Sequence, residues 1–317
     1  ERGIVIGRDN RIKGKEFTLI AAQILTSYGI KIYFNFNMLA TPFISYLTRT
    51  KKAIGAINIT ASHNPKQWNA LKLLNDKGEF LNDAEGKDVL ARAEKAEFQY
   101  NDIDSLGHIE HKNTYNTIHI NKVLSLPLVD VNAIKNANFT VAIDCVNSVG
   151  GLILPELLEK LGVKNIIKLN CEATGVFAHT PEPIPENLVD TAAAIRNNKV
   201  DVGFVVDPDV DRLAIINEDG TMFGEEYTLV SVADYVLQHT PRNTVSNLSS
   251  TRALSEIKKK YGKEYNAAAV GEVNVVTKMK ATNAIIGGEG NGGVIYPEIH
   301  YGRDALVGFQ TPRHHMM

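Results

Sequence analysis

Short apolar runs and amphipathic stretches follow one another along the chain in an order that repeats. An apolar run of strand length leads through a polar or glycine-containing loop into a stretch of helical periodicity. This pattern predicts strands over residues 3–7, 139–144 and 244–248, with helices over about 15–28, up to about 161, and over about 252–261. Gly29, Gly162 and Gly262 stand where the three helices should end. The repetition predicts three related α/β domains.

Two changes in composition mark the predicted domain boundaries. Residues 108–122 are polar, rich in His, Asn and Thr, and separate the first unit from the second. Residues 217–220 form a turn-forming Asn-Glu-Asp-Gly cluster, which precedes a helical stretch over 225–238. We therefore expect domains over residues 1–125, 126–221 and 222–317.

The composition is that of an ordinary globular protein with no general affinity for polyanions. The chain has 317 residues, of which 44% are hydrophobic and 22% charged, and its formal net charge is -2. This balance predicts neither nucleic acid nor a membrane as a partner. No apolar run approaches the ~20 residues of a membrane span, and we expect a cytoplasmic protein. Cys145 and Cys171 lack a CxxC partner and are expected to pack in the core.

The segment TASHNP, residues 60–65, follows the apolar run 53–59. Ser, Asn and Pro are turn residues, so one interpretation is simply the end of a strand. The other is that Ser62 is a nucleophile or phosphate carrier at the carboxyl end of a strand, where open α/β sheets bind ligands. A serine hydrolase is disfavoured, because the GxSxG motif is missing around Ser62. On an extended chain His63 would also point to the opposite face from Ser62.

The segment DPDVDR, residues 207–212, lies between two apolar strands. Asp207, Asp209 and Asp211 would repel one another unless a cation neutralised them, and oxygen ligands of this kind suit Mg²⁺. An EF-hand is disfavoured, because its sixth position needs glycine and is Arg212 here, and because the flanks are strands. A solvated acidic turn is the alternative. Arg212 can make forked contacts with a phosphate, or a salt bridge to the aspartates.

Two further segments carry candidate residues. Residues 287–293 place Glu289 and Asn291 among glycines, which suits either a flexible turn or a loop that grips a polyhydroxylated ligand. Lys72 follows Ser62 by ten residues, where the chain returns as a strand. It is either a solvated lysine or, near a phosphorylated serine, a group that stabilises charge or moves a proton.

Together these segments resemble the α-D-phosphohexomutase family, which includes phosphoglucomutases, phosphomannomutases and phosphoglucosamine mutases. The matching parts are GRDNR at 7–11, TASHNP at 60–65 with Lys72, DPDVDR at 207–212 and GEGNGG at 288–293. They occur in family order along nearly the whole chain. The resemblance implies three consecutive α/β domains with mixed sheets flanked by helices, and an active site in the cleft between them.

The resemblance also implies an activity and its residues. A hexose 1-phosphate and a hexose 6-phosphate, of glucose or mannose, would be interconverted through a phosphoserine and a bound hexose 1,6-bisphosphate. Ser62 would carry the phosphoryl group and, with Asp207, Asp209 and Asp211, bind Mg²⁺. The other implied roles are proton shuttling by Lys72, lining of the phosphoryl site by Arg11 and His63, contact with the substrate or its phosphate by Arg212, and binding of sugar hydroxyls by Glu289 and Asn291.

The chain departs from the family pattern at several places. Ala70 stands where the family usually has glycine, and Asn291 and Gly293 stand where many members have Ser and His, so the sugar preference stays open. Glu272 stands where some members place a substrate-contacting histidine. A fourth, phosphate-gripping domain is expected in the family and is missing here, so we expect poor turnover. Phosphoglucosamine mutase, a phosphatase, and a non-catalytic protein that binds sugar phosphate or Mg²⁺ are the alternatives. We expect a monomer or a homodimer.

Overall fold

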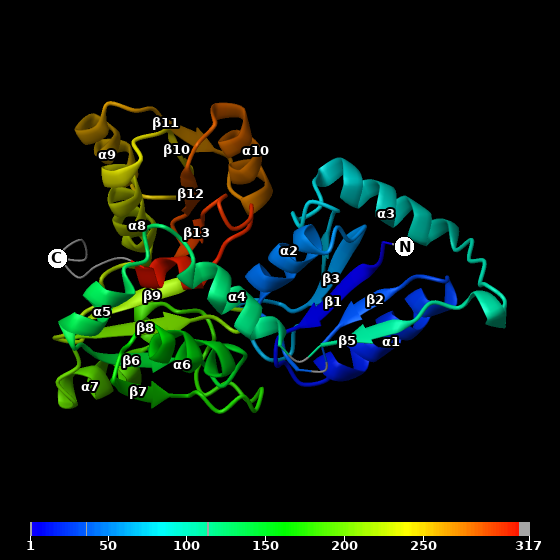
Figure 1. The fold of residues 1–317 in the computed structure, drawn as a ribbon, viewed down its shortest axis with the longest axis horizontal. Coiled ribbons are helices and arrows are strands. Elements are labelled where there is room, and N and C mark those ends of the chain that lie inside the picture. The colour runs from blue at the N-terminus through cyan, green and yellow to red at the C-terminus, as the bar shows by residue number, and fades with distance from the viewer. Residues whose placement is uncertain (1, 36, 113, 311–317) are drawn as a thin grey trace.

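The computed structural model describes residues 2–35, 37–112 and 114–310 and contains three mixed sheets, each flanked by helices (Figure 1). The first sheet lies on the right in Figure 1, the second at the lower left, and the third above the second. This arrangement confirms the predicted α/β class.

The first sheet has the order β4-β3-β1-β2-β5, with β4 antiparallel and the other strands parallel. Its strands are β1 (Ile4–Arg8), β2 (Ile32–Phe34), β3 (Gly55–Ile59), β4 (Leu71–Leu74) and β5 (Ile109–His111). The accompanying helices are α1 (Gly14–Ser27), α2 (Thr41–Thr50), the exposed α3 (Asp83–Lys95) and the short η1 (Ile103–Ser105). Val5 and Ile6 in the central strand are fully buried, as a strand covered on both faces requires.

The second sheet has the order β7-β6-β8-β9, again with one antiparallel edge strand, β9. Its strands are β6 (Thr140–Asp144), β7 (Asn165–Leu169), β8 (Val202–Val206) and β9 (Leu213–Asn217). Its helices are α5 (Val131–Ala137), α6 (Gly150–Lys160), η2 (Pro185–Asn187) and α7 (Val189–Asn197).

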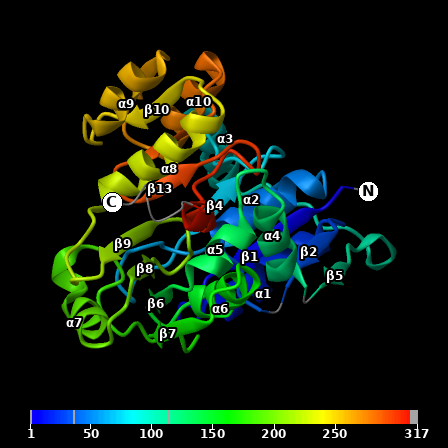
Figure 2. The same ribbon diagram turned by 60° about the vertical axis from the view of Figure 1, so that its left-hand side comes forward.

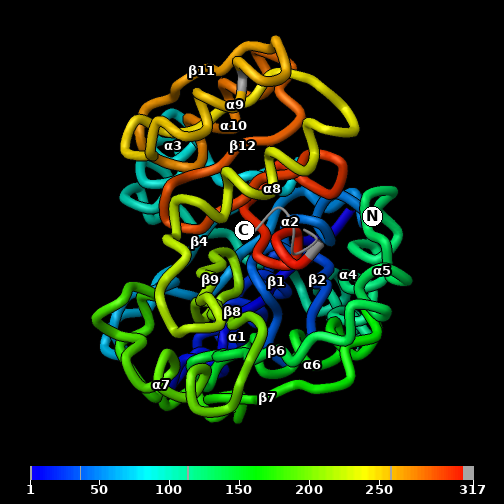
Figure 3. The backbone as a smooth tube through the Cα atoms, turned by 90° about the vertical axis from the view of Figure 1, so that its left-hand side faces the viewer, coloured from blue at the N-terminus to red at the C-terminus, as the bar shows by residue number. Residues whose placement is uncertain are grey.

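The third sheet, β11-β10-β12-β13, repeats the arrangement with β13 as the antiparallel edge strand. Its strands are β10 (Thr244–Asn247), β11 (Tyr265–Ala268), β12 (Ile286–Glu289) and β13 (Gly293–Ile295). The helices are α8 (Glu225–His239), α9 (Ala253–Tyr261), α10 (Glu272–Thr282) and η3 (Ala305–Gln310). Figure 3 shows α8 between this sheet and β9 of the second sheet.

The three predicted strand-and-helix units are confirmed as β1 with α1, β6 with α6, and β10 with α9. Two local predictions need correction. The polar segment 108–122 is not only a separator, because it contains β5 and most of α4 (Tyr115–Leu124), whose His119 and Ile120 are buried. The glycine-rich segment 287–293 is mostly strand, and only residues 290–292 form the turn between β12 and β13.

The chemically distinctive segments occupy the same position in each domain. Each lies where a parallel strand connects to the antiparallel edge strand beside it: β3 to β4, β8 to β9, and β12 to β13. We call them the serine loop (residues 60–70), the aspartate loop (residues 207–212) and the glycine turn (residues 290–292). Because parallel strands present their carboxyl ends at one edge of a sheet, these equivalent positions are ready places for a ligand.

The domains pack through shared apolar contacts. The largest buried cluster includes residues of α4, α6, α8 and η3 together with the second sheet. Figure 2 shows η3 as a short red coil near the centre of the molecule, between α8 and α4. In the part of the chain that the structure describes, no helix is both long and apolar enough to cross a membrane.

Candidate active site

The serine loop and the aspartate loop meet at Ser62. The Ser62 hydroxyl donates a hydrogen bond of 2.8 Å to Asp207 Oδ2, although the two residues are 145 positions apart. Ser62 has φ 49°, in the left-handed region that a side chain other than glycine rarely adopts. Its backbone N–H donates to Thr60 Oγ1 at 3.0 Å. The turn therefore aims the hydroxyl at the aspartates.

Arg11 holds the serine loop in place. Its guanidinium donates to four backbone carbonyl oxygens of the loop, those of Ser62, Asn64, Pro65 and Trp68. Its Nε donates to Asp9 Oδ2 at 3.1 Å, and Asp9 also accepts a bond from Thr60. Burial raises the pKa of Asp9 to about 6. These contacts over-determine the loop and offset the cost of its left-handed residue.

The aspartate loop brings three buried carboxylates together. Asp207, Asp209 and Asp211 are fully buried, and one oxygen of each lies within 4.8 Å of the others. Val210 between them has φ 61°, a costly conformation for a β-branched residue. Asp207 Oδ1 stabilises this turn by accepting bonds of 3.1 Å from the backbone N–H groups of Asp211 and Arg212.

The carboxylates of Asp207 and Asp209 differ in how easily they ionise. Burial, with repulsion from Asp211 and Asp209, holds the pKa of Asp207 well above its usual range. Burial also opposes ionisation of Asp209, but Lys72 and the hydrogen bonds to this carboxylate outweigh it and lower its pKa. An added cation would remove the repulsion that Asp207 experiences.

The unused oxygens of the cluster fit such a cation. Asp209 Oδ1 and Asp211 Oδ1 are buried and accept no hydrogen bond from any described residue. A buried carboxylate oxygen without a partner is costly, and the residues have three oxygen donors that a divalent metal prefers. The group can therefore hold a metal ion.

The remaining oxygen of Asp209 is bound by the first domain. Lys72 Nζ donates to Asp209 Oδ2 at 2.9 Å and lies 3.8 Å from Asp211. Thr41, at the start of α2, donates to the same oxygen. Burial disfavours the Lys72 ammonium, but Asp209 and Asp211 outweigh this effect and raise its pKa. Lys72 is on β4, as predicted, and is an ammonium in this arrangement.

His63 lies closer to Ser62 than the sequence predicted. His63 Nδ1 is 3.4 Å from Ser62 Oγ, and its Nε2 is 3.9 Å from Glu182. The expectation that the two side chains point to opposite faces was wrong, because Ser62 is left-handed rather than extended. Burial and the charge of Arg212 lower the pKa of His63, so the imidazole is neutral near pH 7.

Arg303 is a central residue that the sequence reasoning missed. Its Nη2 donates to Asp211 at 2.6 Å and its Nη1 to Glu289 at 2.7 Å, while its Nε lies 3.0 Å from Glu272. Burial opposes its charge, but these carboxylates raise its pKa further. An isolated arginine outside any motif gave no signal in the sequence. It connects the aspartate loop to the third domain.

Behind Arg303, a buried carboxylate joins two histidines. Asp304 Oδ2 accepts from His119 Nε2 at 2.8 Å and from His300 Nε2 at 3.3 Å. His119 is on α4, and both other residues precede η3. The group therefore ties the segment that carries Arg303 to the helix between the first two domains.

The two predicted sugar-binding residues, Glu289 and Asn291, differ in how firmly hydrogen bonds hold them. Glu289 is buried, and besides Arg303 it accepts bonds from Asn247 and from the Gly271 N–H. Asn291 accepts only from the Gly293 N–H at 3.2 Å among the described residues. Arg212 is nearly buried, with its Nε 3.9 Å from Asp211 and without a hydrogen bond there.

The glycine turn packs directly behind Arg212. Gly292 has φ 84°, and a Cβ at this position would lie 2.5 Å from the Leu213 carbonyl oxygen. The Leu213 N–H in turn donates to the Gly292 carbonyl at 3.0 Å. The third domain therefore contacts the first residue after the aspartate loop, which places all three segments around one centre.

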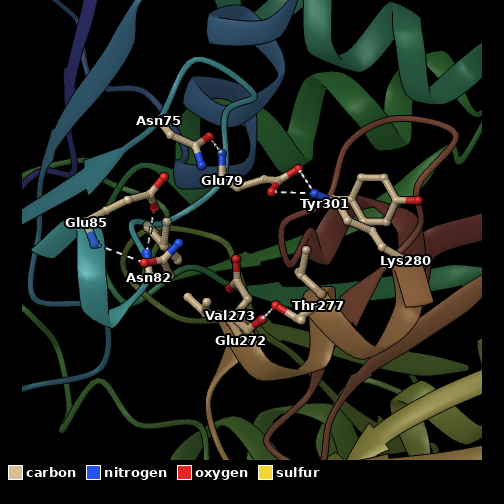
Figure 4. Close-up of a pocket in the computed structure, with 11 residues that line it drawn as sticks. Asn75, Glu79, Asn82, Glu85, Glu272, Val273, Thr277, Lys280 and Tyr301 are labelled. Carbon is tan, nitrogen blue, oxygen red and sulfur yellow. Dashed lines mark hydrogen bonds and ion pairs between the residues drawn. The ribbon is translucent and has the colours of Figure 1, made fainter. Parts of the chain in front are cut away.

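A cleft of about 830 Å³ opens beside this centre. Lys72, Glu272, Glu289 and Arg303 lie in its wall. Figure 4 shows the adjacent smaller pocket, where Glu79 of the first domain forms an ion pair with Lys280 on α10 next to the Tyr301 ring. Burial raises the pKa of Glu272 to about 7. The first and third domains thus contact each other across the cleft.

Comparison with known proteins identifies the family. The chain matches the family descriptions phosphoglucomutase/phosphomannomutase, alpha/beta/alpha domain I over residues 1–100, domain II over 117–220 and domain III over 224–309. The chain belongs to the phosphoglucomutase/phosphomannomutase family. Its three domains are therefore the first three α/β/α domains of that family, in order.

Related proteins differ in the sugar they are named for. A phosphoglucomutase/phosphomannomutase of Thermococcus kodakarensis is 32% identical over 96% of this chain and 66% of the relative. A probable phosphoglucosamine mutase of Methanopyrus kandleri is 26% identical over 94% of this chain and 64% of the relative. A solved phosphoglucomutase/phosphomannomutase family protein of Burkholderia thailandensis superposes with a TM-score of 0.85 at 25% identity, covering 98% and 67% of the two chains. The chain spans about two thirds of the length of these relatives.

Proposed function

We propose that this chain forms the serine, metal and sugar sites of a phosphohexomutase, which moves a phosphoryl group between O1 and O6 of a hexose phosphate. The observation that carries the proposal is the Ser62 hydroxyl, bound at 2.8 Å to Asp207 beside carboxylate oxygens that accept no hydrogen bond from the described residues. A hydroxyl against a group suited to a metal is the arrangement that phosphoryl transfer needs.

The proposed carrier is Ser62. Its oxygen attacks a phosphorus of the bound hexose 1,6-bisphosphate, and the bond from that phosphorus to the sugar oxygen breaks. In the reverse direction a sugar hydroxyl attacks the phosphoserine. Mg²⁺ on Asp207, Asp209 and Asp211 would neutralise charge that develops on the phosphoryl oxygens. Arg11 keeps the loop fixed through its bonds to the Ser62 and Asn64 carbonyls, so orientation is set before the reaction.

Lys72 and His63 are the proposed proton-handling groups. Lys72 is an ammonium in this structure, because Asp209 and Asp211 raise its pKa. It is therefore suited to give a proton to an oxygen from which the phosphoryl group departs. His63 is neutral near pH 7 and lies 3.4 Å from Ser62 Oγ, so it is suited to accept the hydroxyl proton.

The substrate side of the site is proposed to be Arg212, Glu289 and Asn291. Arg212 Nε has no hydrogen-bond partner among the described residues, so its planar group is available for a phosphate oxygen. Glu289 is fixed by Arg303 at 2.7 Å and presents a positioned carboxylate. We expect the sugar to be glucose or mannose, with glucosamine as the alternative. The cytoplasmic location, the monomer or homodimer and the domain boundaries at residues 125 and 221 stay predictions.

The test is phosphorylation of the full chain by glucose 1,6-bisphosphate and Mg²⁺, followed by intact mass and peptide mapping. We expect an increase of about 80 Da on Ser62, the mass of one phosphoryl group. The increase should vanish in Ser62→Ala and persist in Ser125→Ala, which removes an exposed hydroxyl. An unmodified Ser62 under these conditions contradicts the carrier role, and steady release of inorganic phosphate favours a phosphatase.

A further inference from the structure

The two cysteines of the chain are a pair in space. Cys145 and Cys171 are its only cysteines, and both are free thiols. Cys145 directly follows β6, and Cys171 follows the neighbouring strand β7 closely, with the last residues of these parallel strands in register. The two Sγ atoms lie 3.5 Å apart, in hydrogen-bond contact. Core packing by itself does not require the two cysteine side chains to contact each other.

The two thiols differ in access and in acidity. Cys145 is fully buried and Cys171 is partly exposed. The hydrogen bond with Cys145 lowers the pKa of Cys171, to which Lys168 also contributes, whereas burial raises the pKa of Cys145. Because the thiolate is the nucleophile, the accessible cysteine is the more reactive of the two.

A metal does not explain the pair. Among the described residues, the groups that can hold a metal ion are the three aspartates and His119 with His300 and Asp304, and neither group includes a cysteine. The nearby Asp144 carboxylate is already occupied by bonds from Asn170, His179 and Thr191. Thiol chemistry is therefore the better explanation for the contact.

We propose that Cys171 and Cys145 form a peroxide-sensitive site that closes into an intramolecular disulfide. The Cys171 thiolate attacks one oxygen of hydrogen peroxide, the O–O bond breaks, and the released hydroxide takes a proton and leaves as water. Cys145 then attacks the sulfur of the resulting sulfenic acid, its proton leaves with the hydroxide as a second water, and the S–S bond forms. Two thiols are oxidised and one peroxide is reduced to two waters.

The pair lies behind the aspartate loop. Ser148, three residues after Cys145, donates at 2.8 Å to the carbonyl oxygen of Pro208. The segment that follows Cys171 places the Phe177 ring 5.0 Å from the Arg11 guanidinium. A disulfide would therefore tie together the two segments that support the aspartate loop and the serine loop. We expect the oxidised chain to unfold at a higher temperature than the reduced chain.

The test uses the full chain with hydrogen peroxide, then denaturation, alkylation with N-ethylmaleimide and intact mass. The proposal predicts a product about 2 Da lighter that takes up no maleimide and regains two reactive thiols after dithiothreitol. Peptide mapping should place the bond between Cys145 and Cys171 in the monomer. Two alkylatable thiols after peroxide treatment, or a disulfide only between chains, would overturn it.

Single variants separate the roles of the two thiols. In Cys145→Ser we expect Cys171 to stop at the sulfenic acid, trapped by dimedone, and in Cys171→Ser we expect Cys145 to resist peroxide. Faster oxidation of Cys145 than of Cys171 in these variants would contradict the assigned order. The alkylation experiment on the natural chain does not depend on these variants, so it tests the proposal even if a variant fails to fold.

Discussion

The aspartate loop and the glycine turn hold equivalent positions in their domains, but their polar groups are used in opposite ways. In the aspartate loop, Asp209 and Asp211 each keep a buried oxygen that accepts no hydrogen bond from the described residues. Next to the glycine turn, Glu289 accepts bonds from Arg303, Asn247 and Gly271, so both of its oxygens have hydrogen-bond partners. The same connection thus leaves carboxylate oxygens without hydrogen bonds in one domain and gives both oxygens of a carboxylate hydrogen bonds in another.

This difference separates groups that await a ligand from groups that position others. A buried oxygen without a hydrogen bond costs free energy, so it marks a position where a ligand can bind. A carboxylate paired with a buried arginine indicates a rigid framework, whose disruption leaves several charges uncompensated. Substitutions in the two regions should therefore fail in different ways, in chemistry for the first and in folding for the second.

The largest effect is expected from Lys72→Met. This variant removes the ammonium that lies 2.9 Å from Asp209, and we expect phosphoryl transfer to Ser62 to slow by about 10²–10⁴-fold, the usual range for a proton-transfer group. The rate is measured by rapid-quench kinetics, which follow the transfer of the phosphoryl group from glucose 1,6-bisphosphate to Ser62. Lys66→Met, at an exposed position of the serine loop that precedes β4, is the control and should leave the rate unchanged. An unaltered rate in Lys72→Met would remove Lys72 from the mechanism.

Arg303→Leu should primarily weaken the fold. The change leaves Asp211, Glu272 and Glu289 without their shared cation, and breaking a buried pair of this kind costs about 3–5 kcal/mol of unfolding free energy. Urea denaturation measures it. Arg92→Leu, in an exposed helical pair with Asp88, should change stability by about 0.5 kcal/mol or less. Similar losses in both variants would contradict the central position of Arg303.

Glu272→Gln should alter the pH dependence of stability. Burial raises the pKa of Glu272 from 4.5 to about 7, so the folded state binds a proton before the unfolded state as the pH falls. The natural chain should therefore gain up to about 3 kcal/mol relative to Glu272→Gln as the pH falls from above 7 to below 4.5, and the difference should level off about one pH unit beyond each limit. Denaturant midpoints of both proteins across this pH range test the prediction. The same pH dependence of stability in the two proteins would contradict a raised pKa of Glu272.

The smallest effect is expected from Asn291→Ala. Among the described residues Asn291 makes one side-chain bond, which it accepts from the Gly293 N–H, so we expect a stability change of about 1 kcal/mol or less. If it contacts the sugar, the ratio of transfer rates for glucose and mannose bisphosphates should change by roughly tenfold. Asn198→Ala, directly after α7, serves as the control for loss of an exposed amide. An unchanged ratio would exclude Asn291 from sugar discrimination.

Local patterns in the sequence predicted the repeated units and the residues that lie within motifs. Alternation of strands, loops and helices predicted β1 with α1, β6 with α6 and β10 with α9, because each element carries its own periodicity. Spacing also predicted the aspartate group, since its three carboxylates lie within five residues of one strand connection. These features depend on short stretches of chain.

Contacts between distant segments could not be predicted in this way. Arg303 meets Asp211 across 92 positions, and Thr41 meets Asp209 across 168. No local periodicity encodes such pairs, which exist only after the domains pack. The prediction of the His63 orientation was wrong for a different reason. The left-handed backbone at Ser62 turns the His63 side chain towards the Ser62 hydroxyl.

The central claim is that the unpaired oxygens of the aspartate loop bind a divalent cation. Titration of the full chain with Mn²⁺, monitored by electron paramagnetic resonance, tests it most directly, because free and bound Mn²⁺ give different signals. We expect one site that Mg²⁺ displaces, that is lost in Asp209→Asn, and that persists in Asp76→Asn, where an exposed carboxylate is removed. Equal Mn²⁺ binding in Asp209→Asn and in the natural chain would contradict the account.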